Sequence, residues 1–480
     1  MQSFPQPSPM RWQPRRFKSA AIVVAIGLLW LISAWQSNWL VAAIGTVPGI
    51  VLIATGAGQL LWGGDRQLCY HMALAGPVSS ILALVLGYWL GWAACLALVA
   101  GGGAAFMVAG WALRVQHPVP ADVSPPTTHA KLLAKMASDA ALLGFFINCA
   151  QVPRGAAVDT DLAELAAFGE LADQRGWIAH PERFHGAAQA PEAPLIRRQC
   201  TLGINYEWLT AESAYRPPAD LPGLQRWQSY RRNRRMATRI LRHDDTQDRP
   251  WLVCVHGYRM GVAGLDFQLF NVERLHRQLG LNVAMPILPL HGVRRATPLT
   301  GGLFLDGPLA DLVHAQAQSL CDLRSTIAWI RQVDPKARIG VLGYSLGGYH
   351  AALLSAYEPD LACVIAGIPM IDIAATLWQH LPTAHARYLE ARGLTAEAVA
   401  QRLTPVSPLA VKPQVVRERR FIFAATADQL IAPEQPLALW RHWDEPALQW
   451  YDGSHLSVRH EVDIGPFIDR ALQETGMYAG

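Results

Sequence analysis

Residues 338–348 read Arg-Ile-Gly-Val-Leu-Gly-Tyr-Ser-Leu-Gly-Gly, and this stretch decides the fold. The apolar run 339–342 predicts a short buried strand, and the pattern of residues 349–354 predicts a helix. Between them stands Gly-x-Ser-x-Gly, centred on Ser345. Glycines two residues before and after the serine suit a tight, strained turn, because larger side chains there would collide with the neighbouring strand and helix. The stretch therefore predicts a strand, a sharp turn that exposes the Ser345 hydroxyl, and a helix.

Composition sets limits on the class of protein. The chain has 480 residues, too many for one ordinary domain, and a formal net charge of +4. This charge gives no strong field for nucleic acid, so no nucleic-acid partner is expected. The seven cysteines include no Cys-x-x-Cys pair and are expected to be free thiols. No set of residues has metal-ligand spacing and no phosphate-binding loop occurs, so we expect neither a metal nor a cofactor.

The first quarter of the chain is strongly apolar. Residues 19–64 and 67–113 contain no Asp, Glu, Lys or Arg, and only Asp65 and Arg66 separate the two blocks. A spanning helix needs about 20 residues, so each block is long enough for a helical hairpin. Tryptophans near the block ends resemble an interfacial belt. Four membrane spans are expected, near 19–36, 39–62, 71–90 and 92–113.

The orientation of these spans follows from the basic residues around them. The relevant residues are Arg11, Arg15, Arg16, Lys18, Arg66 and Arg114. With four spans these residues share one side, and the positive-inside rule places that side in the cytoplasm. Three spans would instead place the rest of the chain outside. The first hairpin is the weak point, because its opening helix is short.

Beyond the apolar blocks the pattern changes twice. Residues 117–126 form a Pro-rich linker, followed by helical patterns at 130–151 and 159–175 that could pack on protein or on the membrane surface. From residue 197, strands alternate with helices, which predicts a mostly parallel eight-stranded sheet flanked by helices. The expected strands lie near 200–209, 236–242, 251–256, 282–287, 338–343, 362–367, 420–425 and 447–451.

Two more strand ends carry candidate catalytic side chains. The apolar strand in residues 421–425 runs into a loop that delivers Asp428, and the strand ending near 451 is followed by Gly-Ser and then His455. With Ser345 these residues stand in the order serine, acid, histidine. Residues 197–480 therefore resemble the α/β-hydrolase superfamily, which uses this order. A further strand ends in His256-Gly257-Tyr258, at the place where this superfamily provides an oxyanion-hole amide.

The resemblance implies a role for each residue. Ser345 would be the nucleophile, His455 its base and Asp428 the acid that orients the imidazole. The amides of Tyr258 and Leu346 would bind the oxyanion. Some members carry the acid at the position of Asp372, which stays open as an alternative, whereas His256 is expected to be structural. Residues 373–416 occupy the position of the lid.

Two arginine-rich runs have no role in this scheme. Residues 231–235 could be a solvated turn or could contact anionic lipid, with the turn favoured. Residues 291–295 follow a strand that borders the expected site, and anion recognition there is open.

The sequence thus predicts a membrane region (1–116, about four spans), a linker and helical segment (117–196) and an α/β-hydrolase domain (197–480). The expected function is a membrane-anchored, cytoplasmic serine hydrolase that cleaves a carboxylic ester or thioester, with a small-molecule or lipid-like ester as substrate. Two alternatives are an inactive hydrolase-like membrane scaffold and the accessory domain of a transporter. Peptidase or acyltransferase activity is also open, because the same triad serves these reactions. Oligomeric state is not readable from the sequence.

Overall fold

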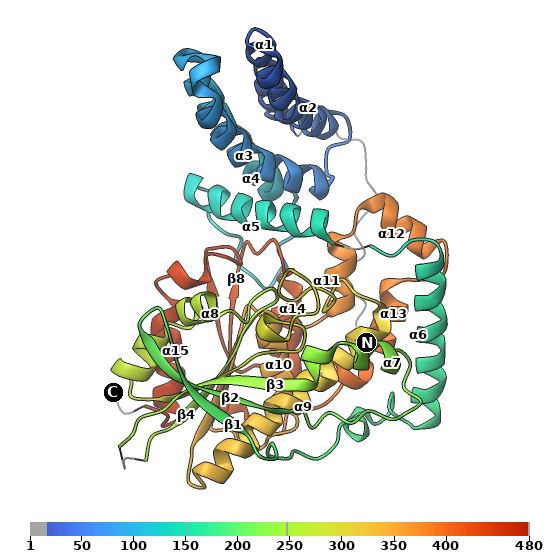
Figure 1. The fold of residues 1–480 in the computed structure, drawn as a ribbon, viewed down its shortest axis with the longest axis vertical. Coiled ribbons are helices and arrows are strands. Elements are labelled where there is room, and N and C mark those ends of the chain that lie inside the picture. Colours follow the sequence, from blue (N-terminus) through green and yellow to red (C-terminus); the bar gives the residue numbers. More distant parts are fainter. Residues whose placement is uncertain (1–16, 151, 246–247, 479–480) are drawn as a thin grey trace.

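The computed structural model describes residues 17–150, 152–245 and 248–478. The chain forms a helical bundle stacked on a larger α/β domain (Figure 1). Arg11, Arg15 and Arg16, on which part of the expected orientation rests, lie outside the described residues. Lys18, Arg66 and Arg114 lie within them.

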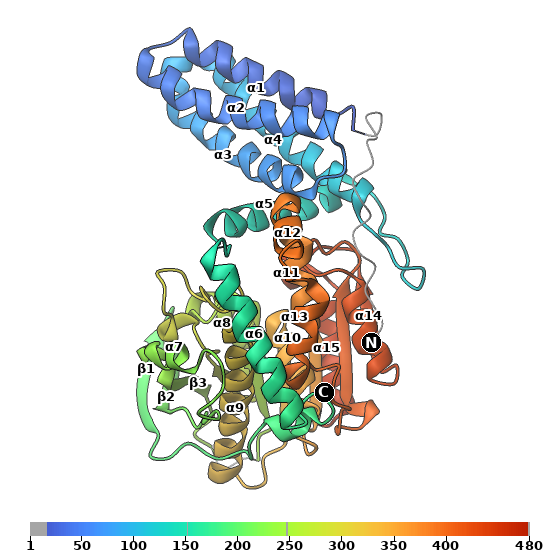
Figure 2. The ribbon, with the colours of Figure 1, turned by 90° about the vertical axis from the view of Figure 1, so that its right-hand side faces the viewer.

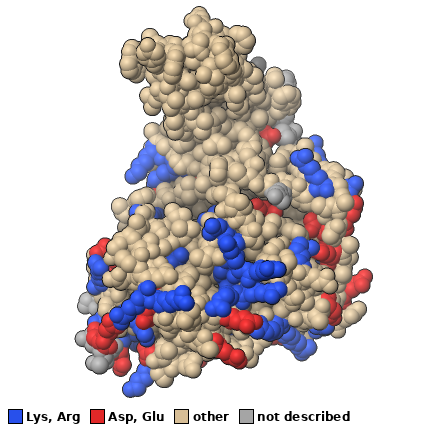
Figure 3. Space-filling model, in the orientation of Figure 1, with Lys and Arg blue, Asp and Glu red and all other residues tan. Residues whose placement is uncertain are grey.

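The bundle contains α1 (Ala20–Trp35), α2 (Trp39–Leu61), α3 (Arg66–Leu90) and α4 (Trp92–Gln116). Asn38 and Asp65 cap the starts of α2 and α3 with their side chains, which explains where these helices begin. Small residues allow close packing: a Cβ on Gly27 would lie 2.7 Å from the Gly49 carbonyl oxygen, and one on Gly76 would lie 2.6 Å from that of Gly102. The upper part of the molecule in Figure 3, which the bundle occupies, shows almost no charged side chains.

Four helices are long and apolar enough to span a membrane, but they are not the expected four. They are α2, α3, α4 and α5 (Ala130–Cys149), whereas α1 has only 16 residues. At about 1.5 Å per residue, α1 is roughly 24 Å long, shorter than the hydrocarbon core of about 30 Å. It packs along α2, with Val24 near Gly56. The expected first span at 19–36 is therefore a helix, but a short one.

Helix α5 lies across the lower end of the bundle, between the bundle and the α/β domain (Figures 1 and 2). Its contacts with α3 and α4 are close. A Cβ on Gly144 would lie 2.8 Å from the Tyr70 carbonyl oxygen, and one on Gly110 would lie 2.2 Å from that of Leu133. The opposite side of α5 contacts loops of the α/β domain. Of the two partners that the sequence left open for this helix, protein or the membrane surface, the structure shows contacts with protein on both sides. Helix α6 (Ala156–Gln174) follows and packs against the side of the α/β domain.

The sheet has nine strands in the order β1-β2-β3-β5-β4-β6-β7-β8-β9. Its strands are β1 (Leu195–Thr201), β2 (Ile204–Glu212), β3 (Arg235–Leu241), β4 (Trp251–Val255), β5 (Asn282–Pro286), β6 (Ile339–Tyr344), β7 (Cys363–Gly367), β8 (Arg420–Ala425) and β9 (Ala447–Tyr451). The part from β5 to β9 is parallel, and β1, β2 and β3 join it antiparallel.

The expected count of eight strands was wrong by one. The predicted strand 200–209 is split between β1 and β2, which form a hairpin through Leu202 and Gly203. Both residues have positive φ angles, 54° and 76°, as a tight two-residue hairpin requires. The apolar pattern continues through this turn and conceals it.

Helices cover both faces of the sheet, so the central strands are buried on both sides. Val253 and Val255 of β4 pack in one core with α9 (Leu309–Val333) and α10 (Leu346–Leu354). Leu252 and Cys254 pack in a second core with α8 (Ala263–Leu269) and α15 (Ile464–Glu474). This two-sided burial explains the unbroken apolar runs of the central strands.

The insertion between β7 and β8 forms α11 (Ile373–His380), α12 (Thr383–Glu390) and α13 (Ala396–Arg402). In Figure 2, α11 and α12 lie close to the lower end of the bundle. The contact is direct, because the Gln67 amide donates to the His380 carbonyl oxygen at 2.6 Å and the Tyr70 hydroxyl lies 3.2 Å from His380 Nδ1. The remaining helices of the α/β domain include α7 (Leu224–Ser229) and α14 (Glu434–His442).

Candidate active site

Ser345 stands at a strained turn between β6 and α10. Its φ and ψ angles are 57° and −114°, a conformation that non-glycine residues rarely adopt. The flanking glycines make the turn possible: a Cβ on Gly343 would lie 2.0 Å from the Gly347 carbonyl oxygen, and one on Gly347 would lie 1.9 Å from that of Val255. The Ser345 side chain is half-buried. The local geometry is that of a nucleophile elbow.

Asp428 and His455 meet at the carboxyl ends of neighbouring strands. Asp428 follows β8, His455 follows β9, and Asp428 Oδ2 lies 2.7 Å from His455 Nδ1. The other carboxylate oxygen of Asp428 accepts hydrogen bonds from the Leu430 and Ile431 amides, each at 2.8 Å. These bonds fix the carboxylate. An Nδ1–H that donates to Asp428 leaves Nε2 unprotonated, as a general base requires.

The electrostatics of His455 favour proton uptake. Burial lowers the pKa of His455, but the Asp428 carboxylate, and to a smaller extent that of Asp139, outweigh burial, so the pKa is raised above its ordinary value. Among the described residues, no hydrogen bond joins the Ser345 hydroxyl to His455. Such bonds are often long in ligand-free enzymes and shorten when substrate binds.

Three other acidic or histidine residues near these strand ends make hydrogen bonds that do not involve His455. Asp372 caps α11 by accepting a hydrogen bond from the Ala375 amide at 2.8 Å. Asp452 accepts a hydrogen bond from the Thr426 hydroxyl at 2.9 Å. The His256 ring is buried, and its Nε2 accepts the Leu288 amide proton at 3.1 Å. The structure therefore places Asp428 beside His455, and gives Asp372 and His256 structural contacts.

Two backbone amides lie near the serine. Leu346 is the first residue of α10, where an N–H has no partner within the helix. Tyr258 follows β4, and among the described residues its amide has no backbone partner. A Cβ on Gly257 would lie 3.6 Å from the Ser345 Cβ, so the turn that carries Tyr258 passes close to the elbow. The assignment of these two amides to an oxyanion hole stays a prediction.

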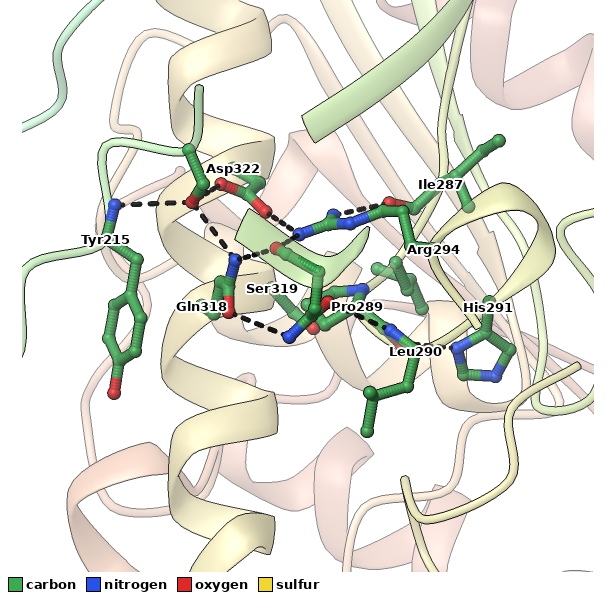
Figure 4. Close-up of polar contacts among 12 residues, drawn as sticks. Tyr215, Ile287, Pro289, Leu290, His291, Arg294, Gln318, Ser319 and Asp322 are labelled. Carbon is green, nitrogen blue, oxygen red and sulfur yellow. Dashed lines mark hydrogen bonds and ion pairs between the residues drawn. The ribbon is translucent and has the colours of Figure 1, made fainter. Parts of the chain in front are cut away.

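A buried ion pair fixes the loop that packs beside Tyr258. Arg294, in the short helix η4 (Gly292–Arg294), donates to Asp322 Oδ2 at 2.7 Å and to the Ile287 carbonyl oxygen at 2.8 Å (Figure 4). The His291 Nδ1–H donates to the Pro289 carbonyl oxygen at 2.8 Å, and the ring lies 5.9 Å from the ring of Tyr258. The loop is thus anchored to α9 on its far side, which steadies the Tyr258 turn.

The two arginine-rich runs come together in space. Residues of η2 (Arg231–Arg234) and of the loop after η4 line a cavity of about 530 Å³. Arg231, Arg232 and Arg295 contribute exposed side chains, while Arg294 is already paired with Asp322. The run 231–235 is a short helix that leads into β3, so it forms a turn between strands. Anion recognition by the cavity stays a prediction.

One residue near the site was not predicted from the sequence. Asp139 of α5 is fully buried, and its carboxylate accepts hydrogen bonds from the Ser454 hydroxyl and from the amides of Gln429, His455 and Leu456. The available signal was that Asp139 is the only acidic residue of a largely apolar helix. The described residues contain no group of three or more His, Cys, Asp or Glu side chains that could hold a metal ion.

Comparisons with known proteins agree with this architecture. The model of the prolyl oligopeptidase family, Peptidase_S9, matches residues 327–451, a segment that includes Ser345 and Asp428 and ends before His455. Two Mycobacterium tuberculosis proteins, the uncharacterized proteins MT2702 (strain CDC 1551 / Oshkosh) and Rv2627c (strain ATCC 25618 / H37Rv), are 36% identical over 315 residues. The match covers 65% of this chain and 75% of each relative.

Solved structures with a similar fold include esterases and peptidases. Acetyl xylan esterase 1 from Thermoanaerobacterium sp. JW/SL YS485 is 15% identical, with a TM-score of 0.44, and the match covers 62% of this chain and 98% of that protein. The acylaminoacyl peptidase of Pyrococcus horikoshii is 12% identical, with a TM-score of 0.35, and the match covers 58% of this chain and 40% of that protein.

Proposed function

We propose that this chain, which belongs to the same family as the two uncharacterized mycobacterial proteins, is a membrane-anchored serine hydrolase that cleaves a carboxylic ester or thioester. The observation that supports this most is the Asp428–His455 hydrogen bond of 2.7 Å, at the same edge of the sheet as the strained Ser345 turn. Two nearby amides and a half-buried serine complete the set that acyl transfer needs.

The first half of the reaction forms an acyl-enzyme. His455 Nε2 takes the proton of the Ser345 hydroxyl while Oγ bonds to the substrate carbonyl carbon. The resulting oxyanion accepts hydrogen bonds from the Tyr258 and Leu346 amides, each worth roughly 3 kcal/mol. Asp428 stabilises the imidazolium. As the tetrahedral intermediate collapses, the bond to the leaving group breaks, and His455 gives its proton to the departing alcohol or thiol.

The second half releases the acid. Water attacks the acyl carbon and gives a proton to His455 Nε2. The second tetrahedral intermediate collapses, the bond to Ser345 Oγ breaks, and the proton returns to Oγ. The products are a carboxylic acid and the regenerated enzyme. No metal or cofactor is needed for either step.

In our proposal the ester carries a lipid-like acyl or alcohol group, because apolar helices that cross a membrane would confine the α/β domain to the surface where such esters lie. Peptide cleavage is the second candidate, and one observation favours it. The prolyl oligopeptidase family model matches the segment that holds Ser345 and Asp428. The same geometry serves an amide, provided that His455 protonates the departing amine.

The α/β domain is placed in the cytoplasm in this proposal. Lys18, Arg66 and Arg114 precede or follow the apolar helices on the side that faces the α/β domain. Basic residues favour the cytoplasmic side of a membrane.

Labelling with a fluorophosphonate probe tests the proposal. The probe reacts only with an activated serine, so the wild-type protein should label and both Ser345→Ala and His455→Ala should not. Asp372→Asn serves as the control, because Asp372 caps α11 and does not touch His455. A folded wild-type protein that stays unlabelled with a small probe would favour the inactive scaffold.

A substrate panel separates the two candidate activities. We expect p-nitrophenyl esters and acyl thioesters to give a higher kcat/KM than proline-containing peptide amides. The reverse order would replace the esterase by a peptidase while keeping the triad.

A further inference from the structure

The carboxylate of Asp139 lies among the catalytic loops although it belongs to the helix beneath the bundle. Its side chain is fully buried, and its hydrogen-bond partners belong to loops of the α/β domain. Oδ1 accepts from the Ser454 hydroxyl at 2.9 Å and the Leu456 amide at 3.0 Å. Oδ2 accepts from the His455 amide at 2.8 Å and the Gln429 amide at 3.1 Å. All four bonds are charge-assisted.

These four bonds tie together the two loops that carry the acid and the base. Ser454, His455 and Leu456 are consecutive residues of the histidine loop. Gln429 directly follows Asp428 in the acid loop. One side chain therefore fixes both partners of the 2.7 Å bond between Asp428 and His455.

The helix that carries Asp139 is itself held tightly from the other side. Its Gly144 and Leu133 backbone contacts with α3 and α4 leave no room for even a methyl group on Gly144 or Gly110. The bundle also reaches the acid loop directly: Arg66 donates to Gln429 Oε1 at 3.0 Å, and the His117 ring donates to the Thr426 carbonyl oxygen at 2.9 Å. These hydrogen bonds hold the acid loop against the end of the bundle.

The negative charge of Asp139 needs a reason, because neutral acceptors could take the same bonds. A buried carboxylate is costly unless it is paired, and no Lys or Arg of the described residues forms an ion pair with Asp139. The group near it that gains a positive charge is His455, when it takes the proton of Ser345. The charge of Asp139 is then favourable at the moment when the imidazolium forms.

We infer that Asp139 is a positioning residue of the active site, which holds the acid and histidine loops in register and stabilises the charged form of His455. This inference rests on the proposed serine hydrolase function. Through this carboxylate, a residue from outside the α/β-hydrolase domain positions the two loops that carry Asp428 and His455.

Other charged groups near the pair must be considered for a pH experiment. His117 and His380 are buried and their pKa values are lowered to about 4, so both are neutral at pH 6–8. Arg66 stays positive and Asp428 faces the ring. Glu461, further along, pairs with Lys135. Burial and the neighbouring Asp428 carboxylate raise the pKa of Asp139 to about 6, so Asp139 is mostly charged above that pH, where it is the second negative charge that acts on His455, after Asp428.

The test measures the second-order rate of fluorophosphonate labelling between pH 5 and 9 for the full-length protein in detergent micelles. Asp139→Asn keeps the shape but replaces one oxygen by an amide nitrogen, which faces two N–H or O–H donors. We expect labelling to slow about 10- to 100-fold, as a shift of about 1 Å in a catalytic group causes. We also expect the acid limb of the pH profile to move to lower pH, because His455 loses a negative neighbour.

Two further variants sharpen the test. Ser454→Ala removes one of the four bonds and leaves the charge, so labelling should slow about 3- to 10-fold with an unmoved pH limb. This variant carries the test if Asp139→Asn does not fold. Ser138→Ala is the matched control: its exposed hydroxyl bonds only to the Ala134 carbonyl oxygen within α5, and the rate should stay within twofold of wild type.

The outcomes separate the two proposals. Absence of labelling in wild type overturns the serine hydrolase and the role of Asp139 together. Normal labelling of wild type that is lost in Ser345→Ala, with Asp139→Asn folded and within twofold, overturns the role of Asp139 alone. A slower Asp139→Asn whose pH limb does not move would reduce Asp139 to a structural residue, which also contradicts the inference.

Discussion

Replacing Gly347 by alanine should damage stability and catalysis together. The added methyl group would lie 1.9 Å from the Val255 carbonyl oxygen, 2.6 Å from its carbonyl carbon and 2.9 Å from the His256 carbonyl oxygen. Ordinary contact is roughly 3.5 Å, so the two backbones must separate by about 1.5 Å. The contacting atoms are backbone and cannot rotate away. We therefore expect a loss of about 3 kcal/mol in the free energy of unfolding, at the upper end of the range for overpacking.

The same movement reaches the oxyanion hole. The turn of Tyr258 begins directly after Val255, so its amide would shift with the end of β4. A shift of about 1 Å in a catalytic group costs about 100-fold in rate. The assay combines thermal unfolding in detergent with the rate of fluorophosphonate labelling. Gly465→Ala is the control, because a Cβ there meets nothing within 4 Å inside α15 and should be neutral or stabilising. A Gly347→Ala protein as stable and reactive as wild type would refute the packing argument.

Four other measurements test separate features. Asp428→Asn should lower kcat by about 10⁴-fold, as removal of the orienting carboxylate does in such triads. His455 must be neutral to act as a base, and its pKa is raised. The kcat/KM of the wild-type protein should therefore increase with pH through a midpoint above 6.5. A midpoint below 6.5 would contradict the electrostatics. Gly102→Ala should weaken the α3–α4 contact, since its Cβ would lie 2.4 Å from the Gly76 carbonyl oxygen. A Cβ on Gly103 would meet nothing within 4 Å, so in detergent Gly102→Ala should have a lower melting temperature than Gly103→Ala. Ser37→Cys, in the turn between α1 and α2, should react with an impermeant maleimide from outside intact cells if the α/β domain is cytoplasmic. The exposed Cys149 and Cys200 are first replaced by serine, and labelling of the Ser37→Cys variant only after lysis would then reverse the orientation.

Local patterns were sufficient for the parts of the fold that depend on neighbours in the sequence. The elbow at Ser345 needs only a strand, two glycines and a helix, all within residues 338–354. Asp428 and His455 could be selected because each follows a strand of a parallel sheet, and the carboxyl ends of such strands meet at one edge. Hydrophobic patterns predicted the apolar helices and the alternation of strands and helices, and the order of the three motifs gave the resemblance to the α/β-hydrolase fold.

Features that depend on contacts between distant segments were not predictable. Asp139 and His455 are separated by 316 residues, and a single acidic residue in an apolar helix gives no indication of its partner. The β1–β2 hairpin was missed because Leu202 adopts a positive φ angle, which a leucine rarely does. The uncharged residues 19–36 predicted a first span, but the structure ends α1 after 16 residues. The position of α5 against the catalytic loops was also not predicted, because it depends on contacts with residues far away in the sequence.

Anchoring and catalysis are joined at α5 in a way that a simple tether would not require. A tether needs only a flexible connection, yet residues 117–149 contribute the His117 bond to the acid loop, the Lys135 bond to Glu461 and the Asp139 bonds to both catalytic loops. Removing everything before residue 150 would leave four donors around the empty position of Asp139 without their acceptor, and buried unpaired donors are costly. The loops would then rearrange toward water. The bundle therefore does more than retain the α/β domain at a surface: in our proposal it sets the geometry of Asp428 and His455, so the isolated α/β domain should be a poorer hydrolase than the full chain even toward soluble esters.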